Sequence, residues 1–370
     1  MTPEWKATPS GKLRGRGLGL PFPGRPGPYN AITDVAGVEV GTVTLITGEG
    51  KLDVGQGPVR TGVTAILPRG RAKAQVPCAA GYHSLNGNGE MTGTVWIEES
   101  GELQAPITIT NTHSCGVTRD ATIRWLVARG VGTGQDWGLP VAAETYDGDL
   151  NDINGFHVAA EHAIAALDGA RGGPVELGSV GGGTGMICYD FKGGNGSASR
   201  VVSVAGAAYT VGVFLQANFG AREQLTVLGV PVGRHIGEDK LRGRDQGSVI
   251  AIVATDAPLM AHQAKRLARR VAMGLARTGT VGNNGSGDIF LAFSTANEAA
   301  FATPAKGARP FETLPNGSLD PLFAGVVEAT EEAVIDAMVA NETMVGRDGN
   351  RSVALPHDRL LALMRQYGRM

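Results

Sequence analysis

The chain has 370 residues, of which 42% are hydrophobic and 18% charged, and its formal net charge is −2. This composition excludes an intrinsically disordered chain, which would be poorer in apolar residues and richer in charge. A nearly neutral chain has no overall field to attract nucleic acid or an anionic membrane, so neither is expected as a partner.

Membrane insertion and export are not predicted either. No segment approaches the ~20 consecutive apolar residues of a membrane span, and residues 1–30 lack the apolar stretch of a signal peptide. The three cysteines, Cys78, Cys115 and Cys188, are too few and too scattered for a disulfide framework or a CxxC metal site. We therefore expect a cytoplasmic, reducing location, with the cysteines as small core residues.

Apolar runs predict strands and helices that alternate loosely along the chain. Runs rich in β-branched residues and bounded by turn residues predict strands at 31–46, 61–70, 105–117, 185–191, 201–218, 224–233, 249–255 and 288–297. Helical spacing predicts helices at 118–130, 152–170, 257–278, 322–341 and 357–368. We expect Thr118 or Asp120 to begin the first helix, and Asp256 and Pro258 the third. These elements predict a layered α/β fold of mixed or antiparallel sheets under helices. No repeat or linker divides the chain, so residues 1–370 are expected to form a single domain.

Glycine is abundant, with 56 residues spread along the chain without a short period, which indicates many tight turns. The densest run, 178–186, has neither the Lys-Ser/Thr of a phosphate loop nor the G-x-G-x-x-G spacing of a dinucleotide fold. His113 stands alone, and His157 and His162 lie five apart without an HExxH motif. We therefore expect no nucleotide, no metal and no other cofactor.

Polar residues gather at the predicted ends of strands. Ser248 begins the strand 249–255 and directly follows Gly247, which alone is an ordinary arrangement. The others are Asn218 at the end of one strand, Glu144 and Tyr146 after an apolar run, and Ser286 and Asp288 at the head of another strand. The glycines around Ser286 do not form a G-x-S-x-G elbow, because a strand and not a helix follows them. Polar groups at glycine-flanked strand ends are typical of α/β active sites, so these residues are the candidate site.

Several motifs occur together and in order. They are 109–114 (ITNTHS), 149–158 (DLNDINGFHV), 181–200 (GGGTGM to FKGGNGSASR), 215–220 (LQANFG), 245–259 (DQGSVIAIVATDAPL) and 284–295 (NGSGDIFLAFST). Together they resemble the DmpA-type family of self-processing L-aminopeptidases/D-Ala-esterases/amidases, which is close to the β-peptidyl aminopeptidases. The resemblance runs from about Asn30 to the C-terminal helices. It implies an α-β-β-α sandwich of mixed sheets, a fold shared with the ornithine acetyltransferases.

The resemblance also implies self-cleavage of the Gly247–Ser248 bond, which gives an α chain of 1–247 and a β chain of 248–370. The Ser248 hydroxyl would attack the preceding carbonyl, and water would hydrolyse the resulting ester. Ser248 would then be an N-terminal nucleophile toward small peptides, amino-acid amides and esters of L-, D- or β-amino acids. The family pattern further implies a homo-oligomer, a tetramer of αβ units.

Site roles follow from the same resemblance. Asn218 matches the oxyanion-stabilising amide, and Glu144 matches the acid that anchors the free ammonium group of the substrate. Tyr146 would donate to the tetrahedral oxygen or to the leaving amine, and Trp137 would form a pocket wall. Ser286 and Asp288 match the hydroxyl and carboxylate beside the nucleophile. The general base is either the freed α-amino group of Ser248, with a reference pKa near 8, or the Ser286–Asp288 pair.

Two alternatives compete with the aminopeptidase hypothesis. An acyltransferase of the ornithine acetyltransferase type would have the same fold and self-cleavage but a threonine nucleophile, and Ser248 argues against it. A non-enzymatic binding protein that is never processed is the other alternative. The intact set of Ser248, Asn218, Ser286 and Asp288 argues against that one.

Overall fold

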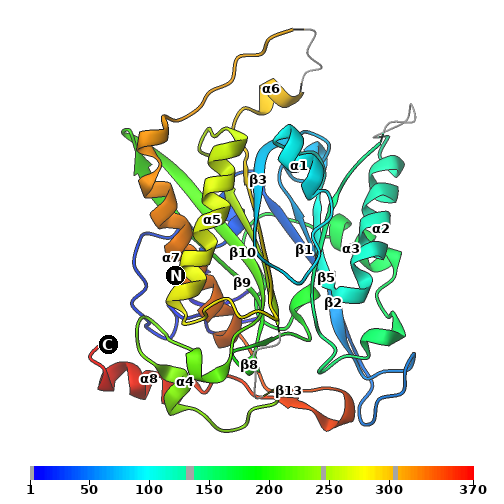
Figure 1. Ribbon diagram of the computed structural model, residues 1–370, viewed down its shortest axis with the longest axis vertical. Coiled ribbons are helices and arrows are strands. Elements are labelled where there is room, and N and C mark those ends of the chain that lie inside the picture. The colour runs from blue at the N-terminus through cyan, green and yellow to red at the C-terminus, as the bar shows by residue number, and fades with distance from the viewer. Residues whose placement is uncertain (1–3, 131–136, 243–246, 303–306) are drawn as a thin grey trace.

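Two stacked β-sheets form the centre of the molecule, and helices cover the outer face of each sheet (Figure 1). The structure is a computed structural model that describes residues 4–130, 137–242, 247–302 and 307–370. From one face to the other, the layers are helices, the larger sheet, the smaller sheet and helices again. The expected α-β-β-α sandwich of mixed sheets is confirmed.

The smaller sheet has four strands in the order β1-β2-β5-β6. These are β1 (Glu39–Thr47), β2 (Val59–Leu67), β5 (Ile107–Asn111) and β6 (Val141–Thr145). Strands β5 and β6 run parallel, and the other pairs are antiparallel. Helices α2 (Cys115–Ala128) and α3 (Ala160–Asp168) cover its outer face, and Trp125 of α2 is fully buried there.

The larger sheet has six strands in the order β4-β3-β12-β11-β10-β9. These are β4 (Glu102–Leu103), β3 (Cys78–Gly87), β12 (Gly287–Ser294), β11 (Ser248–Thr255), β10 (Ala207–Asn218) and β9 (Gly194–Val204). Strands β11 and β12 run parallel, and their other neighbours pair antiparallel. Helices α5 (Ala261–Arg277) and α7 (Asp320–Val339) lie side by side on its outer face (Figure 1).

Shorter elements complete the chain. They are the helices α1 (Thr94–Ser100), α4 (Val232–His235), α6 (Glu298–Ala302) and α8 (His357–Gln366), and the small hairpins of β7 (Ile187–Cys188) with β8 (Phe191–Lys192) and of β13 (Met344–Val345) with β14 (Arg351–Ser352). In the described parts of the chain, no helix is both long and apolar enough to span a bilayer.

Strand β11 shows how the sequence produces the layers. Ile250 and Ile252 belong to the core between the two sheets, whereas Val249, Ala251 and Val253 belong to the core under α5 and α7. Successive strand residues face opposite sides. A strand buried on both faces therefore needs an unbroken apolar run, and the predicted strand 249–255 has one.

Three predicted helix starts are wrong, in each case because the residues before the helix are held in another conformation. Helix α2 begins at Cys115, three residues before Thr118, because Asn111 Oδ1 accepts a hydrogen bond from Ser114 N and closes a 3₁₀ turn before the helix. Helix α5 begins at Ala261, because the Asp256 carboxylate accepts from the backbone of β10 and does not cap the helix. Helix α3 begins at Ala160, after Phe156 adopts a left-handed φ of 52°.

The predicted strand 224–233 is also wrong. This segment follows a 3₁₀ turn, forms one isolated bridge between Val227 and Val230, and then enters α4. Four of its apolar side chains, Leu225, Val227, Val230 and Val232, are buried in the core under α5 and α7, which explains the apolar run although the segment joins no sheet of the described residues. Pro231, which lacks an N–H, also interrupts the ladder of hydrogen bonds that a strand requires.

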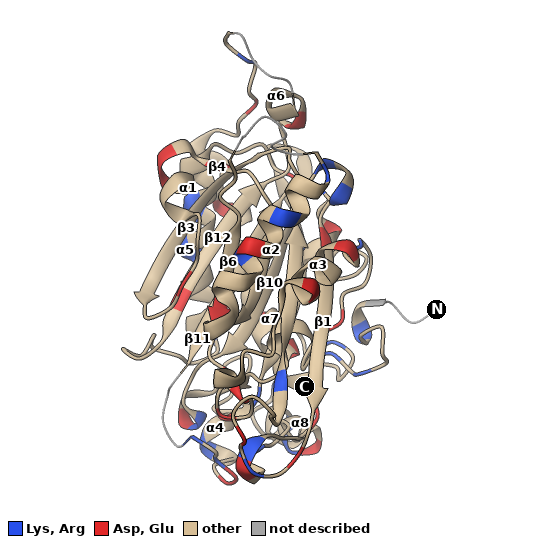
Figure 2. Ribbon diagram, turned by 90° about the vertical axis from the view of Figure 1, so that its right-hand side faces the viewer, with Lys and Arg blue, Asp and Glu red and all other residues tan. Residues whose placement is uncertain are grey.

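The N-terminal segment is bound to helix α7 by charged groups that lie inside the protein. Arg14 pairs with Asp336, and Arg16 pairs with Glu332, which also pairs with Arg200 of β9. Both carboxylates are completely buried. Along the rest of the chain, acidic and basic residues are interspersed over the helices and loops (Figure 2).

Candidate active site

The register of three strands places Ser248 at the centre of the candidate site. Ser248 is the first residue of β11 and pairs with Asn218, the last residue of the antiparallel strand β10. It also pairs with Gly287, the first residue of the parallel strand β12. An antiparallel neighbour brings its end to the start of β11, and a parallel neighbour brings its start there. Ser248, Asn218 and the two polar neighbours of Gly287, Ser286 and Asp288, therefore lie at the same edge of the sheet.

Gly247 has its own steric reason to precede Ser248. A Cβ atom at Gly247 would lie 1.7 Å from the carbonyl oxygen of Asn218, so only glycine fits beside this backbone. The carbonyl oxygen of Gly247 accepts a hydrogen bond from Gly287 N at 3.2 Å. The peptide group before Ser248 is thus held between β10 and β12.

The Asn218 side chain is buried and has partners on both sides of its amide. Its Oδ1 accepts hydrogen bonds from Ile187 N at 2.9 Å and from Arg242 Nη2 at 3.0 Å. Its Nδ2 donates to the carbonyl oxygen of Tyr146 at 2.8 Å. An amide nitrogen carries two hydrogens, so one such bond does not use its full donor capacity.

Ser286 and Asp288 form a buried hydrogen-bonded pair at the start of β12. The Ser286 hydroxyl donates to Asp288 Oδ1 at 2.6 Å, and Asn86 Nδ2 of β3 donates to Asp288 Oδ2 at 3.1 Å. Both carboxylate oxygens therefore accept hydrogen bonds. The predicted proximity of Ser286 and Asp288 to each other is observed, and they precede and follow the residue that pairs with Ser248.

Glu144 lies at the end of β6 in the other sheet and is 3% exposed. Its Oε1 accepts from Glu90 N at 2.9 Å, and its Oε2 accepts a short hydrogen bond from the Thr112 hydroxyl. Burial raises the pKa of Glu144 above its ordinary value, although these two hydrogen bonds oppose the shift. Tyr146, two residues on, is 40% exposed, and partial burial raises the pKa of its phenol.

A pocket of about 780 Å³ joins the two sheets at this edge. Ser248, Gly247, Glu144 and Tyr146 all line it, so the structure brings the proposed nucleophile and the proposed ammonium anchor into one cavity. The other lining residues were not predicted from the sequence; they are Asn88, Gly89, Glu90, Thr112, His113 and Gly285. Two of them, Thr112 and His113, belong to the motif 109–114. The strand in which this motif begins, β5, runs parallel to β6 and ends beside Glu144.

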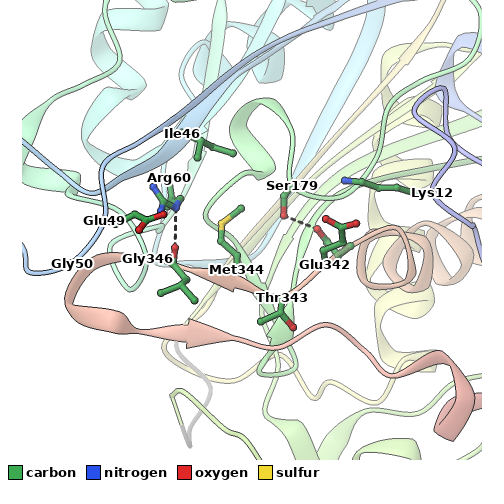
Figure 3. Close-up of a pocket in the computed structure, with 12 residues that line it drawn as sticks. Lys12, Ile46, Glu49, Gly50, Arg60, Ser179, Glu342, Thr343, Met344 and Gly346 are labelled. Carbon is green, nitrogen blue, oxygen red and sulfur yellow. Dashed lines mark hydrogen bonds between the residues drawn. The ribbon is translucent and has the colours of Figure 1, made fainter.

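Trp137 is not among the residues that line this pocket. It is 64% exposed and packs edge-on against Trp96, with ring centroids 5.6 Å apart. A second pocket, of about 570 Å³, contains none of the predicted site residues (Figure 3). Within the described residues, the guanidinium group of its buried Arg60 donates to backbone carbonyl groups, such as that of Val345 at 2.9 Å, so its donors are already used.

Asp147, directly after Tyr146, is a buried acid with a testable effect on stability. Burial raises its pKa from 3.8 to about 7, although hydrogen bonds from Asn151 and others oppose the shift. Between pH 4 and 7 the folded state therefore holds a proton that the unfolded state has released. Below about pH 4 both states are protonated and the free energy of unfolding is not reduced. As the pH rises from 4 to 7 the free energy of unfolding falls, by at most about 4 kcal/mol.

We expect Asp147→Asn to remove this loss while keeping an oxygen that accepts from Asn151. Urea unfolding from pH 4 to 9 measures the effect, and Asp120→Asn on the exposed face of α2 is the control. If the difference between Asp147→Asn and the parent chain does not change with pH, Asp147 is not the titrating group.

Comparison with known proteins agrees with this architecture. A stacked α-β-β-α sandwich with a polar pocket at the strand ends is the architecture of an Ntn hydrolase. A similar structure is that of the L-aminopeptidase D-Ala-esterase/amidase from Ochrobactrum anthropi, which is described as a variant of the Ntn-hydrolase fold. The two chains superpose with a TM-score of 0.90 and 50% identity, over 96% of this chain and 99% of that one. The family model of peptidase family S58 matches residues 30–352, and the chain belongs to this family.

Two further relatives support the assignment. A beta-peptidyl aminopeptidase, BapA of Sphingosinicella microcystinivorans, is 52% identical over an alignment that covers 96% of this chain and 93% of the relative. The structure of a beta-aminopeptidase from Burkholderia sp. superposes with a TM-score of 0.88 at 46% identity, over 96% of this chain and 99% of that one. The predicted resemblance is confirmed, and the chain is a self-processing serine aminopeptidase with the Ntn-hydrolase fold.

Proposed function

We propose that residues 1–370 form one catalytic domain that cuts itself between Gly247 and Ser248. The products are an α chain of 1–247 and a β chain of 248–370, and Ser248 becomes the nucleophile that releases N-terminal residues from small peptides, amides and esters. The observation that carries this proposal is the register of β11. It holds Ser248 between Asn218 and Gly287, on the wall of the pocket that contains Glu144.

Self-cleavage begins with attack of Ser248 Oγ on the carbonyl carbon of Gly247. The hydroxyl proton passes to the nitrogen of Ser248 as the C–N bond breaks, which forms an ester and a free amine; water then hydrolyses the ester to the carboxylate of Gly247 and restores the Ser248 hydroxyl. Gly287 N already donates to the Gly247 carbonyl oxygen at 3.2 Å. It is therefore positioned to stabilise the negative charge that develops on that oxygen during the attack.

Turnover repeats the attack on the carbonyl of a substrate. The freed α-amine of Ser248 takes the proton of the hydroxyl, because an amine with a reference pKa near 8 is a competent base near neutral pH. Asn218 Nδ2 donates to the oxyanion, and Tyr146 donates to the leaving amine. Both oxygens of Asp288 already accept hydrogen bonds, so we assign it to orient Ser286 rather than to take up the proton.

Glu144 anchors the ammonium group of the substrate. We expect Glu144→Gln to raise KM for an amine-bearing substrate by about 10- to 100-fold, because a charge-assisted hydrogen bond is lost. Substrates that lack the amine should be unaffected, and this comparison is the control. Since burial raises the pKa of Glu144, binding by the parent enzyme should weaken on acidification at a higher pH than for an ordinary glutamate. A KM that rises equally for both substrates would contradict the assignment.

We propose further that the substrates include peptides with an N-terminal β-amino acid, since β-peptidyl aminopeptidases are among the similar proteins. We also propose a homo-oligomer of αβ units, four in number, and a cytoplasmic location. Cys78, Cys115 and Cys188 are free thiols in the core, in keeping with a reducing compartment. Light scattering of the purified enzyme tests the oligomer.

A denaturing mass spectrum of the purified protein tests self-cleavage. We expect two masses that sum to the mass of the full chain plus one water, with a β chain that begins at Ser248. Release of p-nitroaniline from β-homoglycine and D-Ala p-nitroanilides, compared with acetyl transfer to ornithine, tests the reaction. A single full-length mass together with acetyl transfer would contradict the proposal.

A further inference from the structure

We propose that Arg242 is a positioning residue that orients the amide of Asn218 for catalysis. The inference rests on the proposed function, in which Asn218 Nδ2 donates to the oxyanion. The guanidinium group of Arg242 donates through Nη2 to Asn218 Oδ1 at 3.0 Å. It touches no reacting atom and acts on the reaction through Asn218, while its charge, like that of Arg347, also lowers the pKa of Tyr146 against the raising effect of burial.

The contacts of Asn218 define one orientation of its amide. Two donors, Arg242 Nη2 and Ile187 N, face Oδ1, and one acceptor, the carbonyl oxygen of Tyr146, faces Nδ2. In the flipped amide, the NH₂ group would face two donors and the oxygen would face a carbonyl, so all three hydrogen bonds would be lost. The Asn218 side chain is buried, so the lost hydrogen bonds would leave polar groups unsatisfied inside the protein.

Arg242 contributes more to this arrangement than the backbone donor does. It carries a full charge, and a charged donor makes a hydrogen bond about twice as strong as a neutral one. A cation on Oδ1 also polarises the amide, which makes its N–H groups better donors to a developing oxyanion. Arg242 therefore both fixes the orientation of the Asn218 amide and makes its N–H groups stronger donors.

Arg242 is itself held in place by two carboxylates. Its Nε donates to Asp149 Oδ2 at 2.6 Å, and its side chain is 5% exposed. The carboxylate of Asp190 accepts from the backbone nitrogens of Leu241 and Arg242 at 2.9 and 3.0 Å. A side chain this constrained keeps a fixed geometry, as a positioning group must.

The place of Arg242 in the chain adds a consequence. It lies five residues before Gly247 and remains in the α chain after cleavage, whereas Ser248 begins the β chain. The hydrogen bond between Arg242 and Asn218 does not involve the scissile bond, so we expect it both before and after self-cleavage. One residue of the α chain therefore supports both reactions of Ser248.

A double-mutant cycle tests the proposal on the processed enzyme. Arg242→Ala, Asn218→Ala and the double variant are compared by kcat and KM on an amino-acid p-nitroanilide. We expect Arg242→Ala to lower kcat by about 10- to 100-fold with KM within about twofold, since the support of a catalytic group is lost. Because Arg242 acts through Asn218, the double variant should be no slower than Asn218→Ala alone. Arg242→Lys, which keeps the charge but not the planar fork, should recover part of kcat.

Chemical rescue provides an independent readout. Added guanidinium chloride, at concentrations that leave the parent enzyme unaffected, should restore kcat of Arg242→Ala saturably. The matched control is Arg347→Ala, because the charge of Arg347, like that of Arg242, lowers the pKa of Tyr146, whereas Arg347 donates to Gly148 O and has no contact with Asn218 among the described residues. Its kcat should be close to that of the parent and should not respond to guanidinium.

The outcomes separate the inference from the proposed function. If Asn218→Ala retains full kcat, the proposed role of Asn218 fails, and the inference fails with it. If Asn218→Ala is slow but Arg242→Ala is not, or if their effects on kcat multiply, only the inference is overturned. Loss of kcat without rescue, accompanied by an equal loss of thermal stability in Arg242→Ala and Arg242→Lys, would make Arg242 merely structural.

Discussion

A Ser248→Ala chain is expected to remain a single polypeptide of 370 residues and to lose aminopeptidase activity by about 10⁴-fold or more, since both reactions need the same hydroxyl. Its fold should persist, because β11 is held by ladders to β10 and β12 and by apolar side chains on both faces. Thermal stability should therefore change by less than about 1 kcal/mol. Denaturing mass spectrometry and p-nitroanilide hydrolysis measure the two losses.

The matched control for this variant is Ser294→Ala at the far end of β12. Ser294 is a buried serine on the neighbouring strand, and its hydroxyl donates to the carbonyl oxygen of Ala257, outside the pocket. This variant should still be cut and active. If Ser248→Ala appeared as two chains and Ser294→Ala as one, the assignment of the processing nucleophile would be wrong.

Asp336→Ala is expected to destabilise the protein by about 3–5 kcal/mol, because it leaves the buried charge of Arg14 without its partner. Arg14 Nε donates to Asp336 Oδ2 at 2.8 Å, and Gly15 N donates to Asp336 Oδ1 at 2.7 Å. The Arg14 side chain is 3% exposed and that of Asp336 is completely buried. The variant therefore loses the attachment of the N-terminal segment to α7 as well as an ion pair.

Urea unfolding of the Ser248→Ala chain, in which one polypeptide unfolds, measures this loss. The control is Asp120→Ala, which removes an exposed partner of Arg124 on α2. An exposed pair at this spacing contributes only about 0.3–0.5 kcal/mol. Equal urea midpoints for the two variants would show that the buried pair does not hold the N-terminal segment.

The site illustrates what was predictable and what was not. Glycine-bounded apolar runs are local features, so Ser248, Asn218 and Asp288 were placed at strand ends from the sequence. Their mutual geometry was not predictable from pattern, because it depends on β11 lying antiparallel to β10 and parallel to β12. Most other residues of the pocket wall are not predictable from the sequence for the same reason, since Asn88 and Thr112 directly follow strands of different sheets, β3 and β5.

The errors in the secondary structure have physical causes of the same kind. Segment 224–233 has an apolar composition typical of a strand. Most of its apolar side chains pack into the core beside α5, and among the described residues its backbone belongs to no sheet. Aspartate at position 256 is a residue type that often caps a helix, but its carboxylate accepts a hydrogen bond from the backbone nitrogen of Thr210 in β10. In both cases a contact between segments outweighs a local preference.

The sequence by itself determined the alternation of strands and helices, the absence of a metal or nucleotide motif, and a set of polar residues at strand ends. These follow from hydrophobic period and turn chemistry, which act over a few residues. Only the tertiary structure decided that Arg242, in a charged turn, reaches Asn218, and that Arg14 pairs with Asp336 across 322 positions of the chain. Such pairs form where two packed layers bring distant backbone together, and their free energy depends on burial that no local pattern encodes.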